Sequence, residues 1–378
     1  MNTNSYYDGL DVYKIDLSKL LVGDILLTRN RRTNSIKGRR QADIISAATG
    51  GRFSHALLCS LPPTFVEAIG AGVSTLSMQN CFCHDLSDVR LLRYPDAQVA
   101  HAAGSWAMTR LGQGYSVRKA VLSVVPNARV PGTDEGTFCS ALVATAFGAA
   151  GAAEFLIGNP FGMTPADLQR MVCLVDVTAS IFQRILSPRN IEQMTALDGD
   201  RAVTPSMQQA QIHAQLRAQL TPRIEAILSS YPDYDYPLPE TFFECLEFII
   251  KSMAMQPSRI PKGLRAELEV LDKTASELLS GGALDEMISA MVELEAREAG
   301  RLLEESFATT PDIDRSDLQN VYQVTLRQIG ERSRIFSDPD LPRGASLAWD
   351  KWLELTEKTV GAMRDRLAVL AEVIARTQ

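Results

Sequence analysis

The sequence predicts an α+β domain followed by an all-α domain, and three observations support this fold class. Up to about residue 180, short apolar runs of strand length alternate with turns rich in glycine and proline. Beyond about residue 200, turn residues become sparse and apolar residues recur every three or four positions. The charge also changes, because residues 1–180 carry 16 basic and 14 acidic side chains whereas residues 181–378 carry 22 and 31. We therefore place one domain over residues 1–180 and a helical domain of unknown role over residues 200–378.

Four runs in the first domain have the length and the borders of β-strands. Their interiors are apolar, and glycine, proline or polar residues flank them. The runs cover residues 23–29, 54–61, 65–73 and 89–95. Only the short turn LPPT separates the second run from the third, so we expect these two strands to be adjacent and antiparallel.

Two helices are predicted in the same domain. One covers residues 97–112, and the other lies within EGTFCSALVATAFGAAG, residues 135–151. The second stretch has small apolar residues on all sides, which indicates a helix packed in the core.

Cys139 lies where the predicted core helix begins. A cysteine nucleophile reacts as its thiolate, and the unpaired N–H groups and the macrodipole of a helix N-terminus stabilise that charge. The preceding residues have turn character, and Thr137 is a candidate cap. A cysteine at the start of a buried helix is also a common small core residue. The assignment of Cys139 as a nucleophile therefore depends on a partner base.

Histidine is the base that a thiol nucleophile needs, and the chain contains four, namely His55, His84, His101 and His213. Two of them lie in predicted helices, where a polar-face or interfacial position is the default, and a third lies in a cysteine-containing loop. His55 remains, at the head of an apolar strand, and Glu67 is a lone carboxylate on the next strand. An antiparallel pair would bring their side chains together, which gives a base, an orienting carboxylate and a nucleophile in chain order. A strand-edge carboxylate is the alternative role for Glu67.

Six segments between residues 15 and 175 resemble one known family. In chain order they are LLVGDILLTR, GGRFSHALLC, FVEAIGAGV, GQGYS, TFCSALVATAF and TPADL. They are similar to the circularly permuted branch of the NlpC-type papain-like superfamily, which contains bacterial YiiX/YebB-like proteins and lecithin:retinol acyltransferase. In this branch the histidine precedes the cysteine, as it does here. The resemblance implies a permuted papain-like catalytic domain, in which a small antiparallel sheet packs against the helix that begins at the nucleophile. It also implies that Cys139 is the nucleophile, that His55 is the base and that Glu67 is the third polar residue. Tyr115 matches a tyrosine that lines the substrate site.

The resemblance implies a thiol-dependent hydrolase or acyltransferase that forms a thioester on Cys139. The family's substrates divide between lipid acyl groups and peptide amides, including those of cell-wall peptides. The permuted branch is associated with lipids, and residues 147–163 supply an apolar segment after the nucleophile helix, so we favour lipid acyl esters and a phospholipase-like activity. A buried core segment also explains residues 147–163, and a cell-wall peptide amidase or endopeptidase stays the alternative. We expect no cofactor and no metal.

A non-enzymatic interaction protein is a second class of function. In this interpretation the helical domain binds a protein partner and the first domain is a scaffold. Residues 237–255, PLPETFFECLEFIIKSMAM, have the apolar density of a partner-binding helix or of a buried one. The joint presence of His55, Glu67 and Cys139 argues against a scaffold, because nothing structural requires all three. The appended helical domain is also compatible with a bacterial effector or toxin.

Charge and hydropathy argue against several partners. The net charge of −7 and a pI near 5.3 argue against nucleic acid. No stretch approaches the roughly 18 to 20 apolar residues of a membrane span, which leaves only peripheral membrane contact open. The N-terminus lacks the basic start and apolar core of a secretory signal, so we expect a soluble protein that is cytoplasmic or exported without such a signal.

The six cysteines are irregularly spaced, which indicates reduced thiols rather than a disulfide framework. Cys81, Cys83 and His84 lie close together in CFCHD. No second ligand pair accompanies them at a recognisable spacing, so we expect a strand end or a loop there rather than a zinc site.

Overall fold

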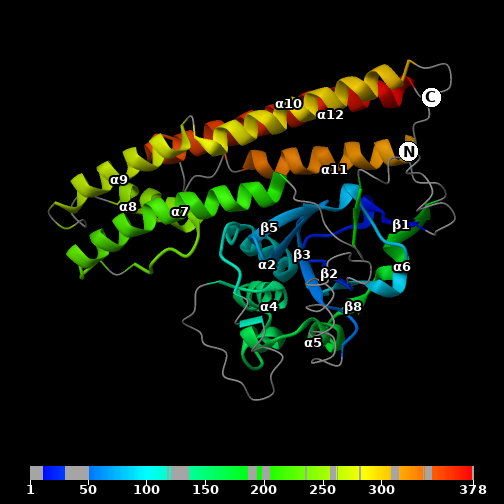
Figure 1. Cartoon of the computed structure of the whole chain (residues 1–378), viewed down its shortest axis with the longest axis horizontal. Helices are drawn as coiled ribbons and strands as arrows, with labels where there is room; N and C mark the ends of the chain where they lie inside the picture. Colours follow the sequence, from blue (N-terminus) through cyan, green and yellow to red (C-terminus); the bar gives the residue numbers. More distant parts are fainter. Residues whose placement is uncertain are drawn as a thin grey trace, which may run out of the picture. The chain divides into compact units, whose positions relative to one another are not determined.

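The chain is mixed α+β, with a sheet region followed by a helical half (Figure 1), as the sequence predicts. The computed structural model describes residues 12–29, 51–116, 119–120, 136–185, 194–197, 205–234, 236–255, 261, 263–280, 282–307, 315–334, 336 and 343–376. The chain divides into two compact units. The first comprises Met1–Arg110 and Gly114–Met207, and the second comprises Leu111–Gln113 and Gln208–Gln378.

The first unit extends beyond the predicted boundary at residue 180. Strand β9 (Phe182–Ile185) pairs antiparallel with β1 (Val12–Ile15), and β10 (Thr195–Ala196) pairs in parallel with β6 (Cys81–Phe82). Backbone pairing therefore keeps residues beyond 180 in this unit. Strands of two to four residues carry too little alternation to be recognised from the sequence.

A six-stranded sheet forms the centre of the first unit. Its strands lie in the order β5, β4, β3, β2, β7, β8, and all neighbours are antiparallel. Their bounds are β2 (Ile25–Thr28), β3 (His55–Leu61), β4 (Thr64–Ile69), β5 (Gly72–Ser77), β7 (Val89–Arg93) and β8 (Val175–Asp176). Buried aliphatic residues fill the central strands, so the sheet is a core element on both faces.

The predicted single strand over residues 65–73 is wrong. Strand β4 ends at Ile69 and β5 begins at Gly72, and the two pair antiparallel with Glu67 opposite Ser74. Gly70 and Ala71 form a two-residue turn between them. The apolar residues on both sides of this turn resemble one continuous run in the sequence.

Two helices pack against each other and against β3. Helix α2 (Ala97–Thr109) approaches the sheet closely because Gly104 has no side chain: a Cβ there would lie 2.8 Å from the carbonyl oxygen of Cys59 in β3. Helix α4 (Cys139–Ala149) has eight buried residues and also contacts β4, which agrees with the predicted core helix. Two short helices follow, α5 (Pro165–Arg170) and α6 (Thr178–Ile181).

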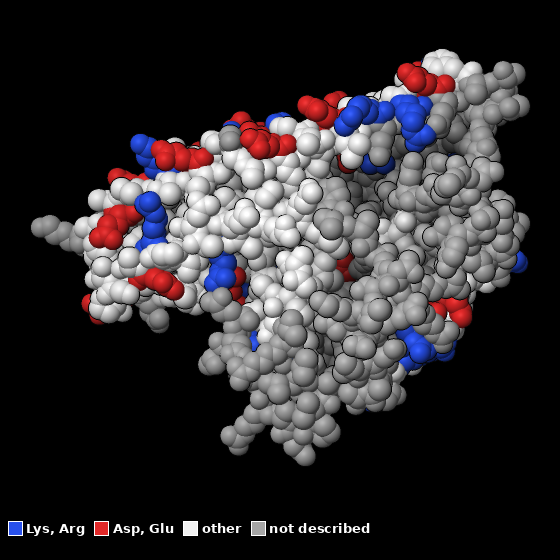
Figure 2. Space-filling model, in the orientation of Figure 1, with Lys and Arg blue, Asp and Glu red and all other residues white. Residues whose placement is uncertain are grey.

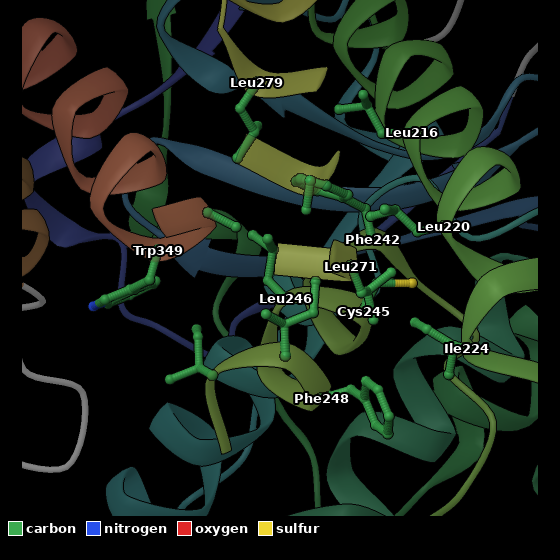
Figure 3. Packing of buried hydrophobic residues seen from close by; sticks show 14 of the residues in the cluster. Leu216, Leu220, Ile224, Phe242, Cys245, Leu246, Phe248, Leu271, Leu279 and Trp349 are labelled. Carbon is green, nitrogen blue, oxygen red and sulfur yellow. The ribbon is translucent and has the colours of Figure 1, made fainter. Parts of the chain in front are cut away.

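The described part of the helical half contains six long helices. They are α7 (Pro205–Ser230), α8 (Phe242–Ala254), α9 (Leu264–Leu279), α10 (Ala283–Glu305), α11 (Arg315–Arg334) and α12 (Leu347–Arg376). Figure 3 shows part of their main apolar cluster, with Leu220 from α7, Phe248 from α8 and Trp349 from α12. The apolar face of α8 is buried in this cluster, so the helix within residues 237–255 is a buried core helix rather than a free partner-binding one. None of the described helices has the length and apolar character that crossing a bilayer requires.

Charged side chains of both signs alternate along the helical half on the face shown in Figure 2. Several form pairs one helical turn apart, such as Arg265 with Glu269 and Lys273 with Glu277. Exposed pairs of this kind contribute at most about 0.5 kcal/mol each. The acidic excess of the helical half is therefore interspersed with basic residues on this face, as on a solvated helix surface.

His213 is buried in the helical half, so the polar-face position expected as one alternative is wrong. Its side chain is fully buried, and both ring nitrogens lack a hydrogen-bond partner among the described residues. The ring stacks on Phe242 and lies edge-on to Phe243, with centroid distances of 5.3 and 5.2 Å. Trp352 is a further aromatic neighbour at 6.3 Å. Burial lowers the pKa of His213 to about 4, so the ring is neutral near neutral pH.

Acid is expected to destabilise the helical half through His213. Because the folded-state pKa lies below the ordinary 6.5, the unfolded chain binds a proton more readily between these two values. The free energy of unfolding is therefore unaffected by His213 above about pH 6.5 and falls as the pH is lowered toward 4. The loss is at most about 3 kcal/mol. His213→Phe should remove this loss, and the matched control is His101→Phe on the exposed face of α2. The measurement is urea unfolding followed by tryptophan fluorescence in a Trp106→Phe background, so that only Trp349 and Trp352 report. Equal acid losses with His213 and with His213→Phe would contradict the prediction.

Candidate active site

The antiparallel pairing of β3 and β4 brings His55 and Glu67 together. The residue directly opposite Glu67 is Leu57, and His55 lies two positions from Leu57 on the same face of β3. The His55 side chain reaches diagonally across the pair, and its Nε2 atom lies 2.7 Å from Glu67 Oε2. The Glu67 side chain is fully buried, whereas that of His55 is 19% exposed. Glu67 is therefore a buried partner of His55 rather than a strand-edge carboxylate.

Cys139 occupies the first position of α4 and lies next to His55. A hydrogen bond joins the Cys139 sulfur to the His55 side chain, and the backbone N–H groups of Ala56 and Ser140 also donate to the sulfur. Because His55 Nε2 is paired with Glu67, Nδ1 is the ring nitrogen left for the sulfur. Cys139 is 7% exposed, so the thiol lies at the edge of the core. The structure thus brings together the three predicted site residues.

The electrostatics of the trio favour an ion pair between Cys139 and His55. Burial opposes a charge on His55, but the hydrogen bonds and negative charges of Cys139 and Glu67 outweigh it and raise the His55 pKa to about 9. Burial likewise opposes the thiolate, but the His55 hydrogen bond and charge, with the two backbone N–H groups, lower the Cys139 pKa below its ordinary value. Between the two pKa values the sulfur is a thiolate and the imidazole is protonated.

Tyr115 lies beside the residues that lead into α4. A parallel β-bridge links it to Thr137, with the Thr137 N–H donating to the Gly114 oxygen and the Ser116 N–H donating to the Thr137 oxygen. Burial, and then the negative charge of Cys139, raise the pKa of Tyr115. Its hydroxyl therefore stays protonated and can act as a hydrogen-bond donor.

The cap predicted for the nucleophile helix is wrong. The N-cap of α4 is Phe138, and no side chain caps the helix, because the Thr137 backbone is engaged in the bridge to residues 114–116. The first-turn N–H groups of α4 are thus left for other acceptors, among them the Cys139 sulfur. Ser140 fixes the other side of the turn by donating from its hydroxyl to the Met163 oxygen at 2.8 Å.

Lys119 and Gly136, which no sequence pattern marks as site residues, hold the segment before Cys139. Gly136 has a φ of 93°, and its carbonyl oxygen accepts a hydrogen bond at 3.0 Å from Lys119 Nζ. The buried Lys119 ammonium also lies 4.5 Å from the centroid of the Phe161 ring. The glycine in PGTDEGTF is visible in the sequence, but its positive φ and the reach of Lys119 depend on tertiary structure.

Gly136→Ala is expected to destabilise the first unit by about 2 kcal/mol and to lower activity. A Cβ at this position would lie 2.7 Å from the Gly114 oxygen, so the turn before Cys139 would have to shift. Gly151→Ala is the matched control, because Gly151 has a φ of 92° but nothing within 4 Å of its added Cβ. Chemical unfolding should show a larger loss for Gly136→Ala; equal losses would mean that the contact with Gly114 contributes nothing.

The other two histidines of the first unit, His84 and His101, lie on other elements. His84 is buried edge-on to Phe82 at 5.1 Å, and His101 is exposed on α2. Cys81 donates from its sulfur to the Ser77 oxygen and belongs to β6, so the CFCHD segment is a strand end as expected. Among the described residues, no group of three or more histidine, cysteine, aspartate or glutamate side chains is arranged to hold a metal ion.

The apolar segment after α4 is partly core and partly surface. Phe147 and Phe155 are buried and stack with centroids 4.6 Å apart. Leu156 and Ile157 are 55% and 80% exposed. Residues 147–163 thus serve the core and also present aliphatic side chains to the solvent.

Comparisons with protein-family models, with curated proteins and with solved structures found no match to this chain, so the geometry of the Cys139 site carries the functional argument.

Proposed function

We propose that this protein is a thiol-dependent hydrolase or acyltransferase with a permuted papain-like catalytic domain. The observation that carries the proposal is the connected trio of Cys139, His55 and Glu67, in which Nε2 of the histidine lies 2.7 Å from the carboxylate. Thiol nucleophiles use this arrangement, in which the thiol contacts a histidine and the histidine contacts a third polar residue. The histidine-first order along the chain and the helix that begins at Cys139 support the permuted arrangement.

Acylation begins with attack of the Cys139 thiolate on the substrate carbonyl carbon. A carbon–sulfur bond forms, and the carbonyl oxygen becomes an oxyanion. We assign the Cys139 N–H at the start of α4 as one donor to this oxyanion and the protonated Tyr115 hydroxyl as the candidate second donor. One such donor commonly lowers the barrier by about 3 kcal/mol. The oxyanion then collapses, the protonated His55 gives its proton to the leaving group, and a thioester remains on Cys139.

Deacylation uses the same groups in reverse. Neutral His55 removes a proton from water or from another acceptor as that acceptor attacks the thioester. The thiolate leaves, and His55 holds the proton beside it. Glu67 keeps the imidazole ring oriented and stabilises its positive charge in both steps. Water as the acceptor gives a hydrolase, and an alcohol or amine gives an acyltransferase.

Lipid acyl esters are the substrate class that we favour. The aliphatic side chains of Leu156 and Ile157, exposed on the segment that follows the nucleophile helix, support contact with an apolar substrate or with a lipid surface. The test is incubation with phospholipid vesicles and, separately, with purified peptidoglycan, with Cys139→Ala as the matched control. Free fatty acid or lysolipid released only by the wild type would support the lipid assignment. Cys139-dependent release of peptide from peptidoglycan alone would replace it with the amidase.

A thiol-directed acyl probe separates the enzyme from an interaction protein. An enzyme should react at Cys139 faster than at the other cysteines, because the Cys139 thiol is paired with His55, which in turn is paired with Glu67. Probe reaction at Cys139 no faster than at the partly exposed Cys173 would favour the interaction protein. Binding of a protein partner by the helical half, as in an effector or toxin, is compatible with either result.

Glu67→Gln is expected to reduce activity by an intermediate amount, about tenfold to a hundredfold. A neutral amide no longer stabilises the imidazolium, so the His55 pKa should fall from about 9 and the Cys139 pKa should rise. The pH range of the ion pair narrows from both sides, and the acidic limb of the rate profile moves to higher pH. The measurement is the rate as a function of pH. A wild-type rate with an unchanged profile would leave Glu67 a purely structural carboxylate.

A further inference from the structure

Ser74 lies on the strand next to that of Glu67. It lies on β5 directly opposite Glu67 on β4, in the antiparallel register that also pairs Glu67 with Leu57 on β3. Directly opposite residues of an antiparallel pair point to the same face, with Cβ atoms about 4.5 to 5.5 Å apart. Ser74 therefore shares the face of the sheet on which Glu67 meets His55.

The Ser74 hydroxyl is a buried polar group that the fold alone does not explain. The side chain has no exposed surface, and its oxygen has no hydrogen-bond partner among the described residues. Alanine or valine would fill the same strand position without burying a hydroxyl, and buried polar atoms without a partner are uncommon in native proteins. A serine at this position therefore points to a role of its hydroxyl.

The neighbouring carboxylate is the acceptor that this hydroxyl suits. An ionised carboxylate accepts several hydrogen bonds, and His55 occupies one position on Oε2. A serine hydroxyl turns freely about its bonds and donates one proton. We infer that Ser74 is a positioning residue for the proposed Cys139 site. Its hydroxyl donates a hydrogen bond to the Glu67 carboxylate, either after rotation of the Ser74 side chain or through one bound water molecule.

The inferred hydrogen bond acts on the nucleophile through Glu67 and His55. Donation to the carboxylate stabilises its ionised form, and the ionised form holds the proton on His55. The His55 charge in turn is one cause of the lowered Cys139 pKa. Removal of the Ser74 hydroxyl should therefore lower the His55 pKa and raise the Cys139 pKa. A serine that only fills space would leave both unchanged.

The test compares Ser74→Thr with Ser74→Val, two residues of nearly equal size that both suit a strand and differ in the hydroxyl. Ser74→Ala is the third variant, and Ser60→Ala, which removes another buried serine of the same sheet, is the control. Circular dichroism verifies that each variant is folded. The readout is the rate of Cys139 alkylation by iodoacetamide as a function of pH, followed by peptide mass spectrometry so that the other cysteines do not contribute.

We expect the valine and alanine variants to alkylate about tenfold more slowly than wild type near pH 6 and to recover at high pH. The threonine variant and Ser60→Ala should follow the wild-type profile. Coinciding profiles for threonine and valine would overturn the inference, even if alanine is unstable. Alkylation needs no substrate, so this test is independent of the proposed function. A shifted alkylation profile without turnover on any substrate would refute the proposed function alone. Cys139-dependent turnover with coinciding alkylation profiles would refute the Ser74 role alone.

Discussion

Cys139→Ala is expected to abolish turnover and to leave the fold intact. The substitution removes the sulfur that forms the thioester, and loss of a nucleophile from a catalytic unit commonly costs at least about a thousandfold in rate. The cost in stability should be small, about 1 kcal/mol, because one small side chain at a helix start is lost and no side-chain cap is involved. The measurement is turnover of the vesicle substrate together with circular dichroism.

Cys139→Ser should be severely impaired as well, because a hydroxyl has no thiolate state in this pH range. The remaining cysteines are the controls: alanine at each of Cys59, Cys81, Cys83, Cys173 and Cys245 should not cause a comparable loss. Full activity in Cys139→Ala or Cys139→Ser would contradict the mechanism.

His55→Ala should reduce turnover about as much as Cys139→Ala. Without the imidazole, the thiol loses the hydrogen bond and the charge that lower its pKa, and no group remains to protonate the leaving group. Members of a catalytic unit act non-additively, so the double variant should be little worse than either single variant. The experiment is a double-mutant cycle on rate. If the two losses multiply, His55 and Cys139 do not work as a unit.

The pairing of His55 with Glu67 was predictable because a short turn joins their strands. The turn makes the strands antiparallel neighbours, and the polar residues stand out from their apolar surroundings. The diagonal register was not predictable, since it depends on where the pairing starts along each strand. Ser74 could not be found either, because the turn of the β4–β5 hairpin lies at Gly70 and Ala71, within a run that resembles one continuous strand.

Other features needed tertiary information. Thr137 has the chemistry of a cap, yet its backbone pairs with residues 114–116 and the helix begins after Phe138. His213 has the helical spacing of an ordinary polar residue, and only the packing of α7 against α8 and α12 encloses it in aromatic rings. Local pattern predicted the elements, whereas the burial of single polar residues followed from contacts between elements distant in sequence.

The central claim is that the Cys139 sulfur carries the acyl group during turnover. The most direct measurement is mass spectrometry of the intact protein after brief exposure to a long-chain p-nitrophenyl ester, followed by peptide mapping and treatment with hydroxylamine. We predict a mass increase of one acyl group, located on Cys139, removed by hydroxylamine as a thioester is, and absent in Cys139→Ala. An acyl group on another residue, or turnover that proceeds at the wild-type rate in Cys139→Ala, would contradict the claim.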